Sequence, residues 1–528
     1  MNNPLKSILW WLGWIAILTG GAWLRFQDLG IRPFHADEAV NGLKLAELRE
    51  SGVARYDPLH YHGNTLWLLS NGYLRLHPHA DHTNPSESDL RSFSAIAGWM
   101  LLLIPLVGWK TFGRTSSLAC GLILAGSPAL LAINRTYIHE SLFILCCIYG
   151  IAFMEKAPRS KHPLHWAIAG GVFWGLMAST KESWPLVLLC LGIGHGISRL
   201  FLGRNKADSG LKLRTTIRTW TWAISAALLT AIAMYSSWGR HPLGIRDALQ
   251  TFFIYQNDPG HSKPWYYFLN LLFCSNRLGR WPTAEFLLIP FMIAGCHAMI
   301  RNVKREPAHL SWAITSLTLI GIHSMIPYKT PWLVTLPFVG IAFICSTGVK
   351  VILASKGFRI PSIVLLIVGS LIWGWAGYRS ALLLPDHHSN RHAYSPTSPD
   401  VIRLTELIES IASLHPDGRN VPIDVIFPQD SNYWPLPWYL RDYKRAAWRN
   451  EIPESHSASI IIAPHDMHLS PKQWPTTDYI TEMRGLRPGL ILRVMIRRDL
   501  WIALMESKEL GTDSQDANSE PKQTIRDS

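Results

Sequence analysis

Two adjacent carboxylates, Asp37 and Glu38, follow shortly after the first strongly apolar segment of the chain. A carboxylate at that position could take a proton from a hydroxyl or amide group that attacks a substrate at the membrane surface. The residues after the pair recur at helical spacing, which predicts an amphipathic helix along the bilayer. A structural role is the alternative, because Asp often caps a helix start and Glu suits the positive end of the helix dipole. The two roles are compatible, and we expect Asp37 to be a general base.

Further titratable side chains fall in connections that we expect to share one side of the membrane. Lone Lys or Arg residues at span ends commonly reach for lipid headgroups, so no single base is informative. Lys181, Glu182 and Lys329 differ, because they occupy tight turns where chain reversal alone favours Gly, Asn or Ser. Charge beside the membrane usually faces a protein interior or a water-filled cavity, so the set indicates a site. Its candidate members are Asp37, Glu38, Asp57, His60, His62, Arg135, His139, Glu140, Lys181, Glu182, Arg240, Arg246, His261, Lys263, Tyr328 and Lys329.

A lipid-linked donor would explain this combination of charges. When a sugar leaves a polyprenyl phosphate, negative charge develops on the phosphate and needs Lys, Arg or a metal ion nearby. The attacking hydroxyl or amide needs a carboxylate to take its proton. Membrane spans would supply a groove for the prenyl chain. The sequence therefore favours transfer of a sugar from a polyprenyl-phosphate donor at the outer surface of the membrane.

Membrane-spanning helices must position these residues. Of the 528 residues, 48% are hydrophobic and only 16% are charged, and apolar runs of spanning length recur along most of the chain. We expect about eleven spans, the first of which is a retained helix because no small-x-small cleavage site follows it. The expected spans are 8–24, 92–109, 116–133, 138–154, 164–179, 183–200, 218–238, 284–300, 309–326, 331–349 and 360–379.

Basic residues concentrate in alternate connections, and this alternation predicts the orientation of the chain. The positive-inside rule places the basic connections and the N-terminus in the cytoplasm. The net charge of +13, which could suggest nucleic acid in a soluble chain, follows from these loops. We therefore expect an integral protein of the inner or plasma membrane. Its outward connections would be 25–91, 134–137, 180–182, 239–283, 327–330 and the chain after the last span.

The chain divides into a transmembrane domain at 1–384, a small extracytoplasmic α/β domain at 385–506, and a tail at 507–528. The tail lacks apolar content and is expected to be disordered. Patterning of the middle part predicts strands at 421–428, 459–464 and 490–496, with a helix at 438–447. In the linker before this domain, a solvated cluster is favoured over a metal site for His387, His388 and His392.

The sequence lacks the motifs of several other chemistries. It has no Walker loop and no GxGxxG or GxSxG motif, which disfavours soluble nucleotide-driven chemistry. Six of the seven Cys residues lie in apolar spans, where they predict packing residues rather than disulfides or a zinc site. The sequence therefore identifies no definite cofactor. A divalent cation at the lipid phosphate is left open as an alternative to the basic side chains.

Five short motifs carry a resemblance to a known superfamily: Phe34-His35-Ala36-Asp37-Glu38-Ala39-Val40, Tyr56-Asp57-Pro58 with His62-Gly63, Thr180-Lys181-Glu182, Pro264-Trp265-Tyr266-Tyr267, and Tyr328-Lys329-Thr330-Pro331-Trp332. With these motifs the chain resembles the GT-C superfamily of polyprenyl-phosphate-dependent glycosyltransferases. That superfamily includes the protein O-mannosyltransferases of glycosyltransferase family 39 and the lipid A aminoarabinose transferases. More closely, the chain resembles a prokaryotic flippase-activity-associated branch. The likeness extends over roughly the first 400 residues and into the C-terminal part at Tyr394-Ser395-Pro396 and Trp438-Tyr439-Leu440-Arg441-Asp442.

The resemblance implies a GT-C fold: a polytopic α-helical membrane protein with amphipathic helices in the first outward loop and a small C-terminal α/β domain. It implies a hexosyl- or pentosyltransferase in which Asp37 activates the acceptor with support from Glu38. Lys181, Arg135 and Lys329, with Tyr328, would hold the lipid phosphate. The supporting residues would be His60, His62, Glu140, Glu182 and His261.

Two other classes of function compete with this hypothesis. A transporter or flippase for lipid-linked glycans would use the same charges to line a path, but it predicts polar residues deep within several spans. A non-catalytic partner of a glycan assembly complex predicts that Asp37→Asn is harmless. The expected partners in every case are the bilayer, a polyprenyl-phosphate-linked sugar and a glycan, lipid or protein acceptor, with no nucleic acid. The sequence names neither the sugar nor the acceptor.

Overall fold

The computed structural model describes residues 4–77, 84–202, 210–254, 262–274, 284–355, 357, 359–387, 389–428, 432–453, 457–467 and 477–517. The chain forms two compact units. The first comprises Met1–Ile31 and Asn41–Tyr394, and the second comprises Arg32–Val40 and Ser395–Ser528. The boundary near residue 394 lies close to the end of the last expected span, but a short piece of the first loop belongs to the C-terminal unit.

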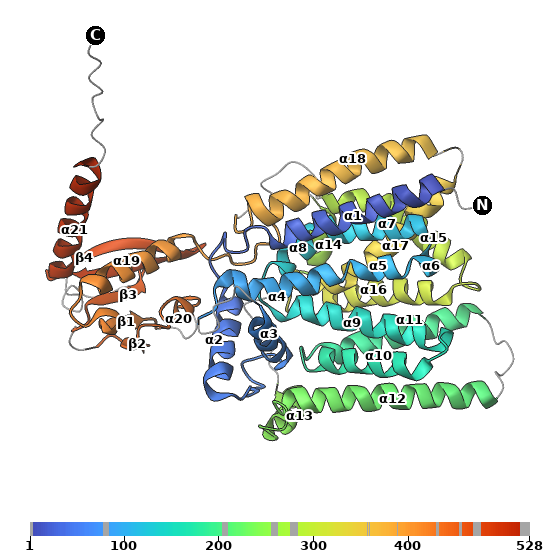
Figure 1. The fold of residues 1–528 in the computed structure, drawn as a ribbon, viewed down its shortest axis with the longest axis horizontal. Coiled ribbons are helices and arrows are strands. Elements are labelled where there is room, and N and C mark those ends of the chain that lie inside the picture. Colours follow the sequence, from blue (N-terminus) through green and yellow to red (C-terminus); the bar gives the residue numbers. More distant parts are fainter. Residues whose placement is uncertain are drawn as a thin grey trace, which may run out of the picture. The chain divides into compact units, whose positions relative to one another are not determined.

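The first unit is helical, and its long helices run side by side (Figure 1). Figure 1 places α3 and α13 at the end of this bundle opposite to the N-terminus. The helices are α1 (Pro4–Phe26), α2 (Ala36–Ser51, whose first residues belong to the second unit), α3 (Thr65–Leu76), α4 (Glu87–Met100), α5 (Leu103–Val107), α6 (Trp109–Phe112), α7 (Arg114–Gly126), α8 (Pro128–Asn134), α9 (His139–Lys156), α10 (Pro163–Ala178), α11 (Trp184–Leu202), α12 (Gly210–Tyr235), α13 (Leu243–Ile254), α14 (Tyr267–Phe273), α15 (Ile289–Arg301), α16 (Pro307–Met325), α17 (Thr335–Ala354) and α18 (Arg359–Tyr378).

Each of the eleven expected spans coincides with a helix or a bent helix pair. Within the described part of the chain, eight helices are long and apolar enough to cross a membrane. A ninth span is added if α7 and α8, which are bent by 58° at Ser127, count as one. The two other expected spans correspond to α10 and α16, which fall outside that set. The protein is therefore a polytopic membrane protein, although the structure does not establish eleven crossings.

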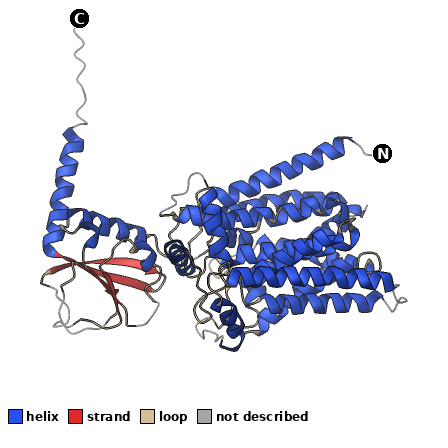
Figure 2. Ribbon diagram, turned by 60° about the horizontal axis from the view of Figure 1, so that its bottom comes forward, coloured by secondary structure: helices blue, strands red, loops and turns tan. Residues whose placement is uncertain are grey.

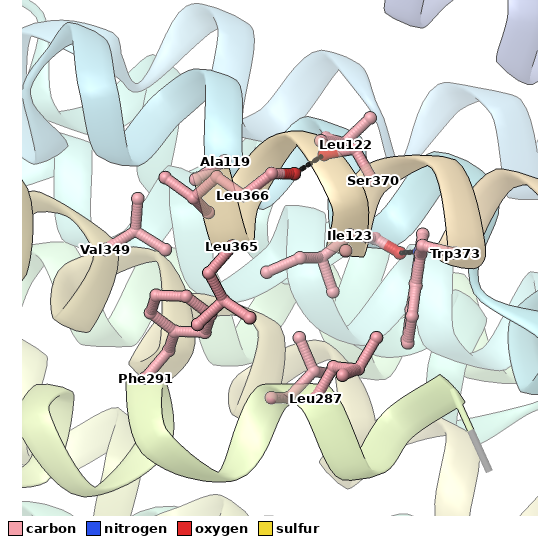
Figure 3. Close-up of a pocket in the computed structure, with 12 residues that line it drawn as sticks. Ala119, Leu122, Ile123, Leu287, Phe291, Val349, Leu365, Leu366, Ser370 and Trp373 are labelled. Carbon is pink, nitrogen blue, oxygen red and sulfur yellow. Dashed lines mark hydrogen bonds between the residues drawn. The ribbon is translucent and has the colours of Figure 1, made fainter. Parts of the chain in front are cut away.

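The core of the first unit lies where α1, α4, α7 and α17 meet, with Trp10, Leu102 and Phe338 buried in it. By contrast, α18 exposes large apolar side chains, as expected for a helix that faces lipid: Ile360 is 76% exposed and Leu371 is 70% exposed. Between α18 and its neighbours is an apolar pocket of about 60 Å³, lined by residues of α7, α15, α17 and α18 (Figure 3). A space this small and apolar could accept part of a hydrocarbon chain but not a sugar.

The helices α10 and α12 approach each other closely through two glycines. A Cβ on Gly171 would lie 2.1 Å from the carbonyl oxygen of Ala223, and one on Gly175 would lie 2.4 Å from that of Ala227. Small residues one turn apart allow the backbones of membrane helices to pack directly against each other. This seam fixes the end of α10, which leads into the Thr180-Lys181-Glu182 turn.

The second unit contains a five-stranded sheet with the order β2-β1-β3-β5-β4 (Figure 2). The strand β1 (Ile423–Ile426) pairs in parallel with β2 (Ala446–Arg449) and with the central strand β3 (Ile460–Pro464). The strand β5 (Leu490–Arg497) pairs antiparallel with both β3 and β4 (Tyr479–Arg487). Two helices, α19 (Asp400–Leu414) and α21 (Arg498–Ala517), contact β4 and each other, and α20 (Leu436–Tyr439) precedes β2.

This unit confirms three predicted strands and corrects one predicted helix. The segments expected to be buried strands contain β1, β3 and β5, and β1 is buried at every position. The helix expected at 438–447 is wrong, because α20 ends at Tyr439 and the same segment goes on into β2. The strand β2 is half exposed and mixed in polarity, so its pattern gave no strand signal. The helix α21 extends to Ala517, into the segment expected to be disordered, and residues 518–528 lie outside the described part.

Candidate active site

Loops at the α3 and α13 end of the first unit gather several titratable side chains. His62 Nδ1 lies 2.7 Å from Glu182 Oε2, across 120 residues of sequence. The hydroxyl of Tyr56 donates to the other oxygen of Glu182 at 3.0 Å and lies 2.7 Å from the hydroxyl of Thr251 on α13. The first loop, the turn after α10 and the helix α13 therefore converge on one carboxylate.

The neighbouring residue in the same turn forms a second buried pair. The ammonium of Lys181 donates to a carboxylate oxygen of Glu140, in the first turn of α9. Lys181 is 8% exposed and Glu140 is 6% exposed. His139, adjacent to Glu140, has its ring 5.1 Å from that of His62, and its Nε2 is buried without a hydrogen-bond partner among the described residues. The His62–Glu182 and Lys181–Glu140 pairs are thus parts of one cluster, which we call the His62–Lys181 cluster.

Close backbone contact holds the Thr180-Lys181-Glu182 turn against the first loop. A Cβ on Gly63 would lie 2.1 Å from the carbonyl oxygen of Ser179, so only glycine fits there without displacement of the backbone. The next loop residues reinforce this contact, because Thr65 donates to the same oxygen from its backbone N–H at 3.2 Å and from its hydroxyl at 2.8 Å. The short turn is therefore fixed from both sides, which fixes the directions of Lys181 and Glu182.

The electrostatics of the cluster favour a charged Glu182. Burial alone would raise the pKa of the Glu182 carboxyl, but the charge of His62 and the hydrogen bonds from His62 and Tyr56 hold that pKa below its ordinary value. Burial, and then the charge of Glu182, raises the pKa of the Tyr56 hydroxyl. Tyr56 therefore stays protonated and serves as a hydrogen-bond donor at any physiological pH.

Asp37 and Glu38 occupy the first turn of α2 and belong to the second unit. The cap is not Asp37: the ring Nδ1 of His35 accepts from the backbone N–H of Asp37 at 3.1 Å. Glu38 is fully buried, accepts from the backbone N–H of His35 at 2.9 Å and pairs with Arg32 at 3.1 Å. Glu38 and His35 therefore form a reciprocal cap. The Asp37 side chain is 52% exposed.

Arg135 and Lys329 bond mainly to backbone carbonyls. Arg135 donates to the carbonyl oxygens of Leu24, Arg25, Gln27 and Asp28, so it closes the C-terminal end of α1. The ammonium of Lys329 is buried and donates to the carbonyl oxygens of Ile326 and Lys263. Burial lowers the pKa of this amine. These contacts favour a role for both residues in fixing the ends of helices and loops.

The other predicted residues lie apart from these contacts. Asp57 and His60 form an exposed pair at 2.9 Å within the first loop. Tyr328 takes part in a β-bridge with Ser262, and His261 lies outside the described residues. Among the described residues, no group of three or more His, Cys, Asp or Glu side chains could hold a metal ion.

The structure adds residues that the sequence analysis did not assign to a role. Tyr56 lies within the Tyr-Asp-Pro motif, but the sequence did not predict its contact with Glu182. No sequence pattern singled out Thr251 or Trp67. The Trp67 ring lies 6.0 Å from that of His139, and its indole N–H donates to Asn41 on α2 at 3.1 Å. In the linker after α18, His392 was expected to be solvated, but it is buried 3.9 Å from Glu285, and burial lowers its pKa to about 4.

Comparisons with known proteins agree with this architecture. The sequence model of the dolichyl-phosphate-mannose-protein mannosyltransferase family matches residues 75–238. No curated protein sequence matches the chain significantly. The crystal structure of ArnT from Cupriavidus metallidurans in the apo state is 14% identical in sequence, with a TM-score of 0.63 over 93% of this chain and 98% of that one.

Two further crystal structures are similar. ArnT from the same organism bound to undecaprenyl phosphate gives a TM-score of 0.63 at 14% identity, over 91% of this chain and 98% of that one. The oligosaccharyltransferase of Archaeoglobus fulgidus in the apo form gives 0.51 at 11% identity, over 83% of this chain and 64% of that one. The chain therefore has the fold of the GT-C glycosyltransferases.

Proposed function

We propose that the protein transfers a sugar from a polyprenyl-phosphate donor to an acceptor on the extracytoplasmic side of the inner or plasma membrane. The observation that carries this proposal is the His62–Lys181 cluster, which places a buried ammonium and a charged carboxylate at one end of a bundle of membrane-spanning helices. The likeness to an ArnT crystal structure that contains undecaprenyl phosphate supports a lipid-linked donor of the same chemical class.

In this proposal, Lys181 binds the donor phosphate. The Lys181 ammonium pairs with Glu140 in the structure described, and a cation at this position would form charge-assisted hydrogen bonds with phosphate oxygens. His139, whose buried Nε2 has no hydrogen-bond partner in the described part of the chain, is a second contact for the phosphate or the leaving oxygen. These groups are fixed before the reaction, so they stabilise the negative charge that develops on the phosphate as the sugar leaves.

Asp37 is the proposed general base. The acceptor O–H or N–H gives its proton to the Asp37 carboxylate while the acceptor atom forms a bond to the anomeric carbon. The bond between that carbon and the phosphate oxygen breaks, and its electron pair stays on the lipid phosphate. Glu38 is buried and bonded to Arg32 and His35, so its support consists of holding the first turn of α2 in place.

A direct test uses the full-length protein in nanodiscs with a panel of radiolabelled polyprenyl-phosphate sugars. We expect one donor to release lipid phosphate and to transfer its sugar, and Asp37→Asn to abolish transfer while the donor still binds. Glu47→Gln on the same helix is the matched control, because its side chain is 46% exposed and pairs only with Lys44 in the structure described. Full transfer activity in Asp37→Asn would reject the base. Movement of lipid across the bilayer without release of phosphate would favour a transporter.

A further inference from the structure

Phe34, three residues before Asp37, is held by the C-terminal unit through three separate contacts. Its backbone N–H donates to the hydroxyl of Tyr439 at 2.8 Å, and its carbonyl oxygen accepts from the hydroxyl of Thr397 at 2.6 Å. Its ring lies 5.0 Å from that of Trp438 and is completely buried. Trp438 and Tyr439 lie in α20, and Thr397 precedes α19. Side chains about 40 residues apart in sequence therefore hold the backbone and ring of Phe34.

A short chain of hydrogen bonds connects this anchor to Asp37. His35 follows Phe34, donates its backbone N–H to Glu38 at 2.9 Å and accepts from the backbone N–H of Asp37 at 3.1 Å. Phe34 is thus fixed by contacts with Thr397, Trp438 and Tyr439, and the cap of α2 fixes His35, Asp37 and Glu38. A shift of Phe34 would therefore move the first turn of the helix, including the Asp37 carboxylate.

Phe34 belongs to the buried interior of the second unit, where its ring packs against Trp438, although it lies outside the cluster on one face of the sheet. The buried cluster on one face of the sheet consists of Ile426, Ala458, Ile461, Ala463, Tyr479 and Met495, and Phe34 is not among them. The hydroxyl of Tyr439 accepts from the backbone N–H of Phe34, and the hydroxyl of Thr397 donates to its carbonyl oxygen. These two contacts therefore hold the backbone of the first-loop segment in place.

We propose that the C-terminal α/β unit positions the general base, with Tyr439 and Thr397 as positioning residues that act through Phe34 on Asp37. This inference rests on the proposed function, because it assigns the unit a part in the same reaction. In this proposal, the role of the unit is to hold Asp37 of the first outward loop in position.

The test is steady-state kinetics of the full-length protein in nanodiscs with the donor that proves active. Tyr439→Phe and Thr397→Val remove one hydroxyl each, and a displacement of the base by about 1 Å should lower kcat by about tenfold to a hundredfold. The KM for the donor should stay unchanged, because Lys181 is not touched. Tyr443→Phe and Thr405→Val are the matched controls. They remove hydroxyls bonded to Glu409 and to the carbonyl of Val401 in the same unit, and they should keep the wild-type kcat.

A double-mutant cycle separates this inference from the proposed function. In an Asp37→Glu background, where the carboxylate is already displaced, Tyr439→Phe should lower kcat much less than in the wild type. Equal kcat values for Tyr439→Phe and Tyr443→Phe, or purely additive effects in the cycle, overturn the positioning role even when Asp37 is the base. Full activity in Asp37→Asn overturns the base, whatever Tyr439→Phe does.

Discussion

The buried pair of Lys181 and Glu140 allows binding of the donor to be separated from stability. The side chains of Lys181 and Glu140 are only 11% and 8% exposed, so removing one partner leaves the other charged and buried. Breaking such a pair costs about 3–5 kcal/mol of unfolding free energy. A loss of activity in Lys181→Met alone would therefore reflect either misfolding or the loss of a phosphate contact.

The double variant Lys181→Met/Glu140→Gln resolves this ambiguity, because it removes both charges and keeps both side-chain volumes nearly constant. Replacing a buried ion pair by neutral groups of similar volume is far less destabilising than breaking it. We expect the double variant to recover at least about half of the stability lost in Lys181→Met. Donor affinity should not recover, since a hydrogen bond to a charged group contributes about 1.5–3 kcal/mol, or about 10- to 150-fold in Kd.

The assay is donor binding and thermal unfolding measured on the same nanodisc preparations. Lys44→Met is the control, because Lys44 forms a more exposed pair with Glu47 at 2.7 Å, and its loss should change neither quantity appreciably. A double variant that is stable and binds the donor as tightly as the wild type would refute the assignment of Lys181 to the phosphate.

Three further outcomes are expected. Gly63→Ala should lower stability by about 1–3 kcal/mol and reduce transfer, because its Cβ would collide with the turn that carries Lys181. Arg135→Met should destabilise the protein through the lost cap on α1 but leave donor Kd unchanged. Because the folded pKa of Glu182 is lowered, its contribution to stability is present above the ordinary carboxyl pKa and is lost as the pH falls through the lower folded value. The His62→Asn variant should therefore show a weaker loss of thermal stability on acidification.

Each of these outcomes has its own control. Gly72→Ala on α3 should be neutral or slightly stabilising, because among the described residues no atom outside its own stretch of helix lies within 4 Å of the added Cβ. Equal losses in the two glycine variants would contradict the steric argument. A weaker donor affinity in Arg135→Met would indicate that Arg135 binds the donor phosphate. An unchanged acid dependence in His62→Asn would show that another group sets the acid sensitivity.

The sequence located the long helices well because their apolar signal is long, local and strong, although eight or nine of the eleven expected spans are long and apolar enough to cross a membrane within the described residues. Apolar runs of about 20 residues are sufficient to locate a spanning helix, and a helix or bent pair occupies each of the eleven expected positions. Short elements were less predictable. The four-residue strand β2 contains Ala446, Ala447, Trp448 and Arg449, whose pattern fits a helix as well as an edge strand.

The contacts of the site were only partly predictable. The charged residues in a tight turn predicted that Lys181 and Glu182 belong to a site. The structure brings Glu182 and His62 together as members of one cluster. The partners themselves depend on how distant loops meet, and no local pattern encodes the contact between Tyr56 and Thr251 across 195 residues. The same limit applies to Asp37. The pattern predicted a helix start there, but the cap formed by His35 and Glu38 and the anchor at Phe34 required coordinates.

The glycine seam between α10 and α12 has a consequence for how the chain tolerates substitution. At Gly171 and Gly175 even one added methyl group would meet the carbonyl oxygens of Ala223 and Ala227, whereas Ile168 on the same helix is 37% exposed. A mutational scan of α10 should therefore find Gly171 and Gly175 intolerant, a turn apart, and the exposed position Ile168 permissive. Because α10 ends three residues before Lys181, a side chain added in the seam would impair activity from a position in the helix rather than in the cluster itself.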